Sequence, residues 1–218
     1  MTALVRYQLT TLLLSQRYLA PLLLFTALVT VLTSDDTGPL TATHAASALA
    51  VLLAATWLTM ALAGLDDPPH RAVLTAATGG PRRLATGTVL AALAACLPLT
   101  VLGLVLPLLV GSHSPTAADL LLGAEAQLTC ACTGSAVGLL AARPVVRRQG
   151  HGLVLALALL LVLTLGKGLP PVNVLLTRLS GHHRSADLIG STGLLLALAA
   201  ALLGAAAVLA HTVAVRRD

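Results

Sequence analysis

The sequence predicts an all-α membrane protein with six transmembrane helices in a single domain, residues 1–218. Of the 218 residues, 57% are hydrophobic and only 10% are charged, and the mean hydropathy is +0.93. A water-soluble domain normally contains about 25% charged residues, so a soluble enzyme is excluded. The apolar residues also form long blocks, and a block of about 20 residues is the length that crosses a bilayer as a helix.

The chain begins with a segment, residues 1–16, that predicts an amphipathic helix lying in the membrane interface. Arg6 and Gln8 lie off its apolar face, and Arg17 follows the segment. The apolar face is formed by Leu4, Val5, Leu9, Leu12 and Leu13. No small-residue cleavage site follows the next apolar run, so we expect the N-terminus to be retained.

Six apolar blocks predict the membrane-spanning helices. They are residues 18–33, 45–65, 84–110, 117–140, 149–165 and 193–215. Ten of the thirteen Lys and Arg residues fall on the side that holds both termini, and the other three are Lys167, Arg178 and Arg184. The positive-inside rule therefore predicts cytoplasmic termini. The excess of Arg over Lys, with much Ala and Leu, is typical of a GC-rich bacterial genome, so we expect a multi-pass protein of a bacterial plasma membrane.

The loop at residues 66–83 is the most organised feature predicted outside the membrane. Asp67 offers a helix N-cap, Pro68 suits the first helical position, and Gly79 and Gly80 end the run. The pattern predicts a short helix between Pro68 and these glycines. It either docks a soluble partner or simply connects two spans.

The segment at residues 166–190 interrupts the chain between the fifth and sixth spans. Pro170 and Pro171 follow two glycines, and Asn173 then opens a short apolar stretch. We expect two short external helices that partly enter the outer leaflet, where neighbouring protein groups must satisfy the broken backbone.

Glu125 is the notable ionisable residue within a predicted span. It lies six residues beyond Asp119, about 9 Å along a helix, and ionisable groups at membrane depth usually face a cavity or a partner. Two interpretations stay open. Glu125 either lines a substrate path or subunit interface, or it is a structural partner, for instance of Arg178 or Arg184.

A nucleotide-binding loop is excluded by the residues around the only Gly-Lys pair. Gly168 follows Lys167 where a phosphate-binding loop needs Ser or Thr, and Leu161 stands in place of its first glycine. Any energy must therefore come from another subunit or from a gradient. We expect no catalytic residue and no metal site in this chain. We also expect no nucleic-acid partner, because the basic residues lie between apolar blocks.

The layout resembles the permease subunits of ABC-2 type transporters, in particular the short actinobacterial ones. The likeness covers essentially the whole chain. It is carried locally by Leu13-Leu14-Ser15-Gln16-Arg17-Tyr18-Leu19-Ala20-Pro21-Leu22-Leu23-Leu24-Phe25, Thr56-Trp57-Leu58-Thr59 and Gly79-Gly80-Pro81-Arg82-Arg83. It implies the ABC-2 permease fold, with two permeases, identical or sister chains, above two ABC ATPase subunits that bind ATP and Mg²⁺.

The resemblance also implies residue roles. The helix after Pro68 matches a coupling helix that sits in a groove of the ATPase, and Arg6 and Arg17 belong to an N-terminal helix that rests on the ATPase. The expected ATPase contacts are Asp67, His70, Arg71, Val73, Leu74, Arg82 and Arg83. Trp57 and Glu125 become candidates for the substrate path or subunit interface, and Pro170, Pro171 and Asn173 for an external gate.

The function implied is export of an amphipathic small molecule, lipid or peptide through the bilayer, without an ATPase site in this chain. One alternative is a haem-exporter-type permease. On the outer side, only His182 and His183 support this alternative. Another is a membrane-embedded enzyme acting on lipid head groups, with Ser180, His182 and Asp187 as its site. A third is an immunity or anchoring protein with no transport cycle.

Overall fold

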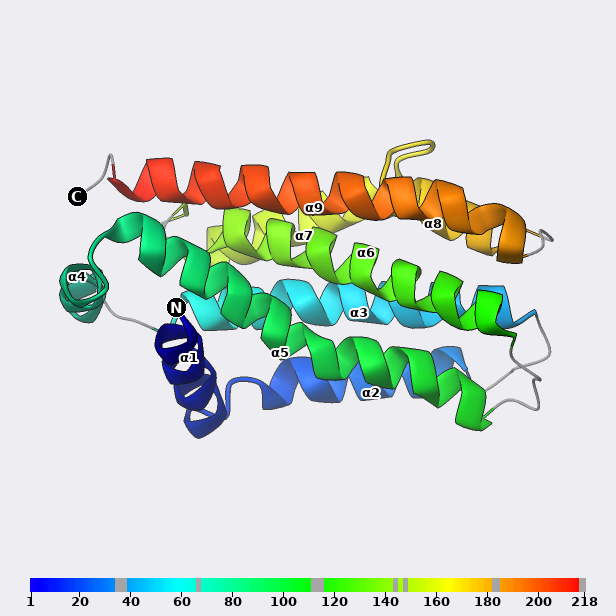
Figure 1. Cartoon of the computed structure of the whole chain (residues 1–218), viewed down its shortest axis with the longest axis horizontal. Coiled ribbons are helices and arrows are strands. Elements are labelled where there is room, and N and C mark those ends of the chain that lie inside the picture. Colours follow the sequence, from blue (N-terminus) through cyan, green and yellow to red (C-terminus); the bar gives the residue numbers. More distant parts are fainter. Residues whose placement is uncertain are drawn as a thin grey trace.

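The computed structural model shows an elongated helical bundle (Figure 1). It describes residues 1–33, 39–65, 68–110, 116–142, 145–146, 149–181 and 185–215. Within these ranges the regular elements are all helices: α1 (Thr2–Leu14), α2 (Leu19–Leu32), α3 (Leu40–Ala63), α4 (Pro68–Ala77), α5 (Pro81–Val110), α6 (Ala117–Ala141), α7 (Gln149–Leu165), α8 (Val172–Leu179) and α9 (Ser185–Val215). Asp66, Asp67, His182, His183 and Arg184 lie outside the described residues.

The two ends of the bundle differ. At one end, α1 and α4 lie across the bundle beside the C-terminal end of α9 (Figure 1), and we call this the basal end. The opposite, distal end holds the start of α3 and of α9. Helix α1 and the C-terminal end of α9 therefore lie at the same end of the bundle.

Four of the described helices, α3, α5, α6 and α9, are long and apolar enough to cross a membrane, and the bent pair α1 and α2 adds up to one more. Helix α2 has 14 residues and α7 has 17. At 1.5 Å per residue they measure about 21 and 26 Å, less than the hydrocarbon core of about 30 Å. The structure thus supports a helical membrane protein with four to five spans, and six full-length spans are not confirmed.

Helix α1 confirms the predicted N-terminal helix but corrects its buried face. It meets α2 at 77° and packs against α5. Leu13 is 58% exposed, whereas Gln8 is only 4% exposed. The Gln8 Nε2 donates a hydrogen bond to Thr88 Oγ1 at 3.0 Å, and Leu4 fills the space where a side chain at Gly87 would stand. A matched polar partner on α5 allows a polar residue to be buried there.

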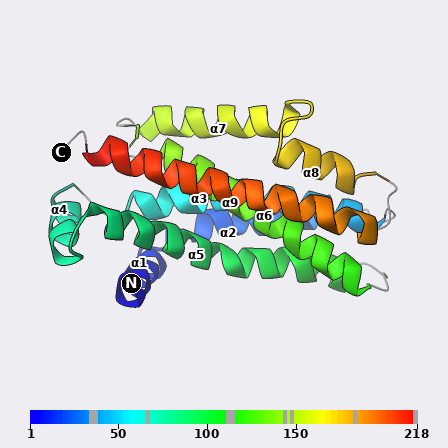
Figure 2. The same cartoon turned by 45° about the horizontal axis from the view of Figure 1, so that its top comes forward.

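Helix α6 packs between α3 and α9 in the centre of the bundle (Figure 2). All three helices run from the distal to the basal end. A Cβ atom at Gly134 would lie 2.5 Å from the Leu52 carbonyl oxygen, and one at Gly138 would lie 2.7 Å from the Thr56 carbonyl oxygen. Glycines of this kind let helix backbones approach closely, and the van der Waals packing gained in this way is one source of helix association within a bilayer.

Helix α8 completes the distal half beyond the end of α7. Its residues Val172, Leu175 and Leu179 are fully buried and the helix packs against α3. Of the two short external helices predicted at residues 166–190, α8 is one. The other is not separate, because α9 begins at Ser185 and takes up the rest of the segment.

Candidate functional site

The basal helix α4 forms where the loop pattern predicts it. It begins at Pro68 and is followed by Gly79 at φ 79° and Gly80 at φ 133°. The Gly80 N–H donates to the Thr75 carbonyl oxygen at 3.0 Å. Positive φ angles favour glycine, so these two residues end the helix and turn the chain into α5.

Helix α4 is tied to α1 by side chains that are far apart in sequence. Tyr7 Oη and His70 Nε2 are 2.8 Å apart, and their rings lie 6.4 Å centroid to centroid. On the outer side of α4, Val73 is 65% exposed, and Ala72, Ala76 and Ala77 are exposed beside it. Helix α4 therefore presents a face of small apolar side chains away from the bundle.

The other residues predicted to contact an ATPase lie near this helix. Leu74 is half-buried, and Arg82 and Arg83 are exposed in the first turn of α5. Asp67 lies outside the described residues, and so does the side chain of Arg71. Arg6 is exposed on α1. The structure thus brings most of the predicted set to the basal end, around α4.

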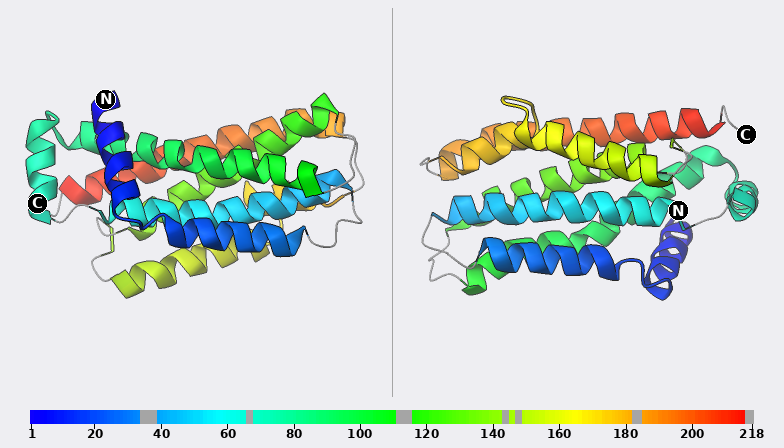
Figure 3. Two further views of the ribbon diagram at one scale, coloured as in Figure 1. Left: turned by 90° about the horizontal axis from the view of Figure 1, so that it is seen from below. Right: turned by 180° about the vertical axis from the view of Figure 1, so that it is seen from behind.

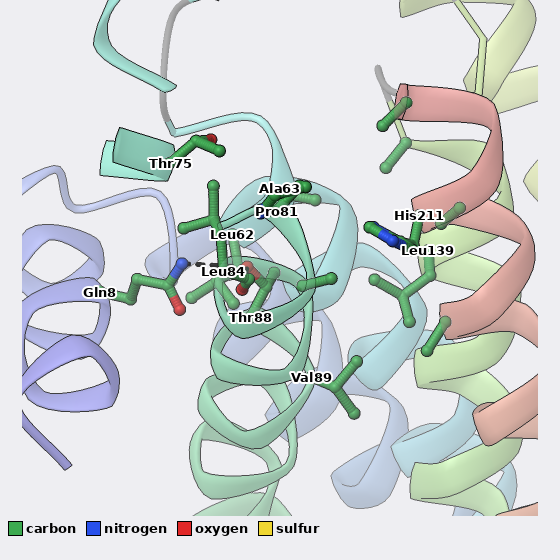
Figure 4. A pocket seen from close by; sticks show the side chains of 15 residues that line it. Gln8, Leu62, Ala63, Thr75, Pro81, Leu84, Thr88, Val89, Leu139 and His211 are labelled. Atoms are coloured by element: carbon green, nitrogen blue, oxygen red, sulfur yellow. Dashed lines mark hydrogen bonds between the residues drawn. The ribbon is translucent and has the colours of Figure 1, made fainter. Parts of the chain in front are cut away.

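A small cavity of about 60 Å³ lies behind α4, between α1, α5 and α9. Figure 4 shows Gln8 with its hydrogen bond to Thr88 on one side and His211 on the other. The Gln8 Oε1 is buried and accepts no hydrogen bond from the described residues. The volume is enough for a few water molecules. Sequence reasoning missed Gln8, because its burial depends on a partner eighty residues away.

A larger groove of about 830 Å³ opens along α2, α3 and α7, which lie side by side in the right panel of Figure 3. The volume falls within the range of small-molecule sites, about 300–1,000 Å³. Its lining includes Leu24, Trp57, Met60, Leu153 and Leu160. Trp57, the only tryptophan, is 46% exposed. The sequence indicated Trp57, but nothing in it indicated the groove.

Arg17 stands at the basal mouth of this groove. It is exposed and its Nη1 donates to the Gly64 carbonyl oxygen at 3.0 Å. Among the described lining residues it is the only charged one. An arginine predicted to lie on the N-terminal helix therefore sits instead in the turn between α1 and α2, beside an apolar hollow.

Glu125 lies apart from both cavities, at the contact between α6 and α9. Its carboxylate accepts a hydrogen bond from Thr192 Oγ1, and a Cβ at Gly193 would lie 3.6 Å from its Oε1. Thr192 is therefore a structural partner of Glu125, in place of the arginines that the sequence suggested. Of those two arginines, Arg184 lies outside the described residues. Asp119 and the N-cap residue Thr116 form a capping box at the start of α6, in which each side chain accepts a hydrogen bond from the other residue's backbone N–H.

At the distal end, the predicted gate residues form the turn between α7 and α8. The Asn173 Oδ1 accepts from the Gly168 N–H at 2.9 Å, and its Nδ2 donates to the Thr164 carbonyl oxygen at 2.7 Å. Pro170 is exposed and Pro171 is buried. Asn173 thus fixes the turn, and the gating role stays a prediction.

The alternative enzyme site is not assembled by the described residues. The Ser180 hydroxyl donates to the Leu176 carbonyl oxygen at 2.8 Å within its own helix end. Asp187 lies in the first turn of α9, and His182 is outside the described residues. No group of three His, Cys, Asp or Glu side chains in the described ranges could hold a metal ion.

Comparisons of the chain with protein-family models, with curated proteins and with solved structures found no match.

Proposed function

We propose that the chain is a transmembrane permease subunit of an ATP-driven ABC exporter. It forms the path for an amphipathic small molecule, lipid or peptide with a second permease, and separate ATPase subunits bind ATP and Mg²⁺ and supply the energy. The observation that carries the proposal is α4, a capped helix at the basal end with an exposed apolar face and a side-chain tie to α1.

The proposal places the basal end in the cytoplasm, where a soluble ATPase is found. Four arginines of the described basal segments are exposed, namely Arg6, Arg17, Arg82 and Arg83. An excess of basic residues marks the cytoplasmic side of a membrane protein. The exposed face around Val73 is then available to a groove of a soluble partner, and its small side chains allow close packing.

A displacement of α4 is transmitted to the bundle through α5. Helix α5 begins at Pro81, just after the Gly79–Gly80 turn. Helix α5 contains Pro98 and Pro107, and each proline removes one backbone hydrogen bond and permits bending. Movement of α4 therefore changes the direction of α5 against α3 and α6. ATP binding by the partner would shift the population between two such arrangements.

Co-purification tests the proposal. The tagged chain is isolated in mild detergent, its partners are identified by mass spectrometry, and ATP hydrolysis is measured. We expect an ATPase to co-purify with the wild-type chain, and Val73→Asp to reduce its amount at least about tenfold, since each 1.4 kcal/mol of lost binding is tenfold.

Thr177→Asp is the matched control, because Thr177 is exposed on α8 at the other end of the bundle. It should retain the ATPase. A wild-type chain that purifies without any ATPase contradicts the proposal, and so does equal loss in the two variants.

A further inference from the structure

The groove along α2, α3 and α7 is as deep as one leaflet of a bilayer. Its lining runs from Gly64, just after α3, back along α3 to Leu53, and along α7 from Gly150 to Leu160. At 1.5 Å per residue these stretches measure about 16 and 15 Å. Half of the hydrocarbon core is about 15 Å. With its basal mouth at the headgroup level, the groove is long enough to reach about the middle of the bilayer.

The chemistry of the groove changes along this depth. Its inner walls are apolar side chains such as Leu24, Leu153 and Leu160, whereas Arg17 stands at the basal mouth. One guanidinium N–H of Arg17 is used by the Gly64 carbonyl oxygen, so further donors are left for a ligand. An apolar hollow with a fixed cation at the headgroup level fits a molecule with an apolar chain and an anionic head.

The helices that border the groove bring bilayer lipid to it. Helices α2 and α7 have 14 and 17 residues, shorter than the spans α3, α5, α6 and α9. A bilayer thins beside apolar segments shorter than its own thickness. Such thinning would bring lipid headgroups of the basal leaflet toward the level of Arg17.

We propose that the groove binds one acyl chain of an anionic phospholipid from the basal leaflet, with the lipid phosphate on Arg17. Guanidinium groups pair with phosphate through two parallel N–H donors. The proposal does not rest on the transport function, because the binding site lies within a single chain and needs no ATPase.

Trp57 provides the measurement, because it is the only tryptophan and lines the groove. The chain is reconstituted in phosphatidylcholine vesicles that contain a small fraction of lipid brominated on its acyl chains, with either a phosphatidylglycerol or a phosphatidylcholine head. Bromine quenches a tryptophan that it contacts. We expect about fivefold preferential association of the phosphatidylglycerol at Trp57, as one cation near the headgroups supplies ~1 kcal/mol.

A second tryptophan position reports ordinary lipid contact. In the double variant Trp57→Phe with Leu209→Trp, the new side chain lies on α9, where Leu209 is 54% exposed. Both positions lie in the basal half of their helix. Here the two brominated lipids should quench equally, because the groove and Arg17 are absent from this face.

Two further variants test the head and the chain separately. Arg17→Gln should remove the preference for phosphatidylglycerol. Gly150→Leu should reduce quenching of Trp57 by both lipids, since a Cβ at Gly150 meets nothing within 4 Å and the added side chain can fill the groove mouth. Gly204→Leu, at an equally open position on α9, should change neither.

The proposal is overturned by equal quenching of Trp57 by the two lipids, or by a preference that survives Arg17→Gln. Absence of quenching by either lipid also overturns it, since a second copy of the chain would then cover the groove. If Arg17→Gln does not fold, the Gly150→Leu and Gly204→Leu pair decides, because equal quenching in those two variants excludes a bound chain.

Discussion

Two helix pairs of the bundle show opposite outcomes of apolar packing. Helices α3 and α6 are each 67% buried over their most apolar stretch and approach until Gly134 and Gly138 touch backbone oxygen atoms. Helices α2 and α7 are also apolar, yet a groove of about 830 Å³ lies along them. Lipid is as apolar as leucine, so hydrophobicity alone does not close two helices in a membrane. Whether two apolar helices approach closely therefore depends on the size of the side chains at their contact.

The largest effect is expected when the close pair is forced apart. In Gly138→Leu the new Cβ would lie 2.7 Å from both the Thr56 carbonyl oxygen and the Thr59 Cβ. Backbone cannot rotate away as a side chain can, so α3 and α6 must separate. We expect a loss of at least about 3 kcal/mol of stability, measured as a large fall in the thermal midpoint in detergent.

The matched control for this substitution is Gly204→Leu, which introduces the same side chain on α9 with nothing within 4 Å. Its midpoint should stay close to that of the wild type. If Gly138→Leu lowers the midpoint no more than Gly204→Leu does, then close backbone approach is not what holds α3 and α6 together.

A smaller effect is expected where the far end of α7 is fixed. Asn173→Ala removes the side chain that joins the Gly168 N–H to the Thr164 carbonyl oxygen. Loss of these two bonds should cost about 1–2 kcal/mol locally. Hydrogen exchange of residues 164–170 should become faster, while Thr177→Ala, which removes only a bond to the Asn173 carbonyl oxygen within α8, leaves it unchanged. Unchanged exchange in Asn173→Ala would show that burial of α8 alone holds this turn.

A polar contact within the close pair is expected to add still less. The Gln127 Nε2 donates to Ser47 Oγ at 2.7 Å between α6 and α3, and both residues are almost fully buried. Interhelical hydrogen bonds of this kind contribute about 0.6 kcal/mol on average in membrane proteins. A double-mutant cycle of Ser47→Ala and Gln127→Leu should give a coupling of that size. A coupling above about 2 kcal/mol would mean that polar contacts, and not the glycines, dominate the pair.

Local signals predicted some parts of this molecule well. Pro68, Gly79 and Gly80 set the ends of α4 through backbone geometry alone, so the sequence pattern was sufficient there. The sequence pattern places the start of the last span at residue 193, eight residues after α9 begins, because the polar residues before it were assigned to the external segment at residues 166–190. Within the structure, Ser185 pairs with Asp119 and Thr192 pairs with Glu125.

Features that depend on contacts between distant segments were not predictable from sequence patterns. From its polar side chain, Gln8 is predicted to be exposed. Only the structure shows Thr88 beside it as a hydrogen-bond partner. The groove is set by where α2 and α7 fail to meet, and an apolar helix gives no sign of which of its faces stays open. Of the candidate site, the helix α4 was predicted and the shape of the hollow around Trp57 was not.

The smallest effect is expected when the open pair is filled. Gly150→Leu adds a side chain at the mouth of the groove, where a Cβ meets nothing within 4 Å. A helical glycine costs up to about 1 kcal/mol relative to alanine, and near a helix end part of this is regained, so the thermal midpoint should stay the same or rise slightly. The contrast with Gly138→Leu points to the cause, since the main difference between the two sites is the space available to the new side chain. A fall comparable to that of Gly138→Leu would mean that α7 closes onto α2 in the membrane and that the groove is not a lasting feature of the fold.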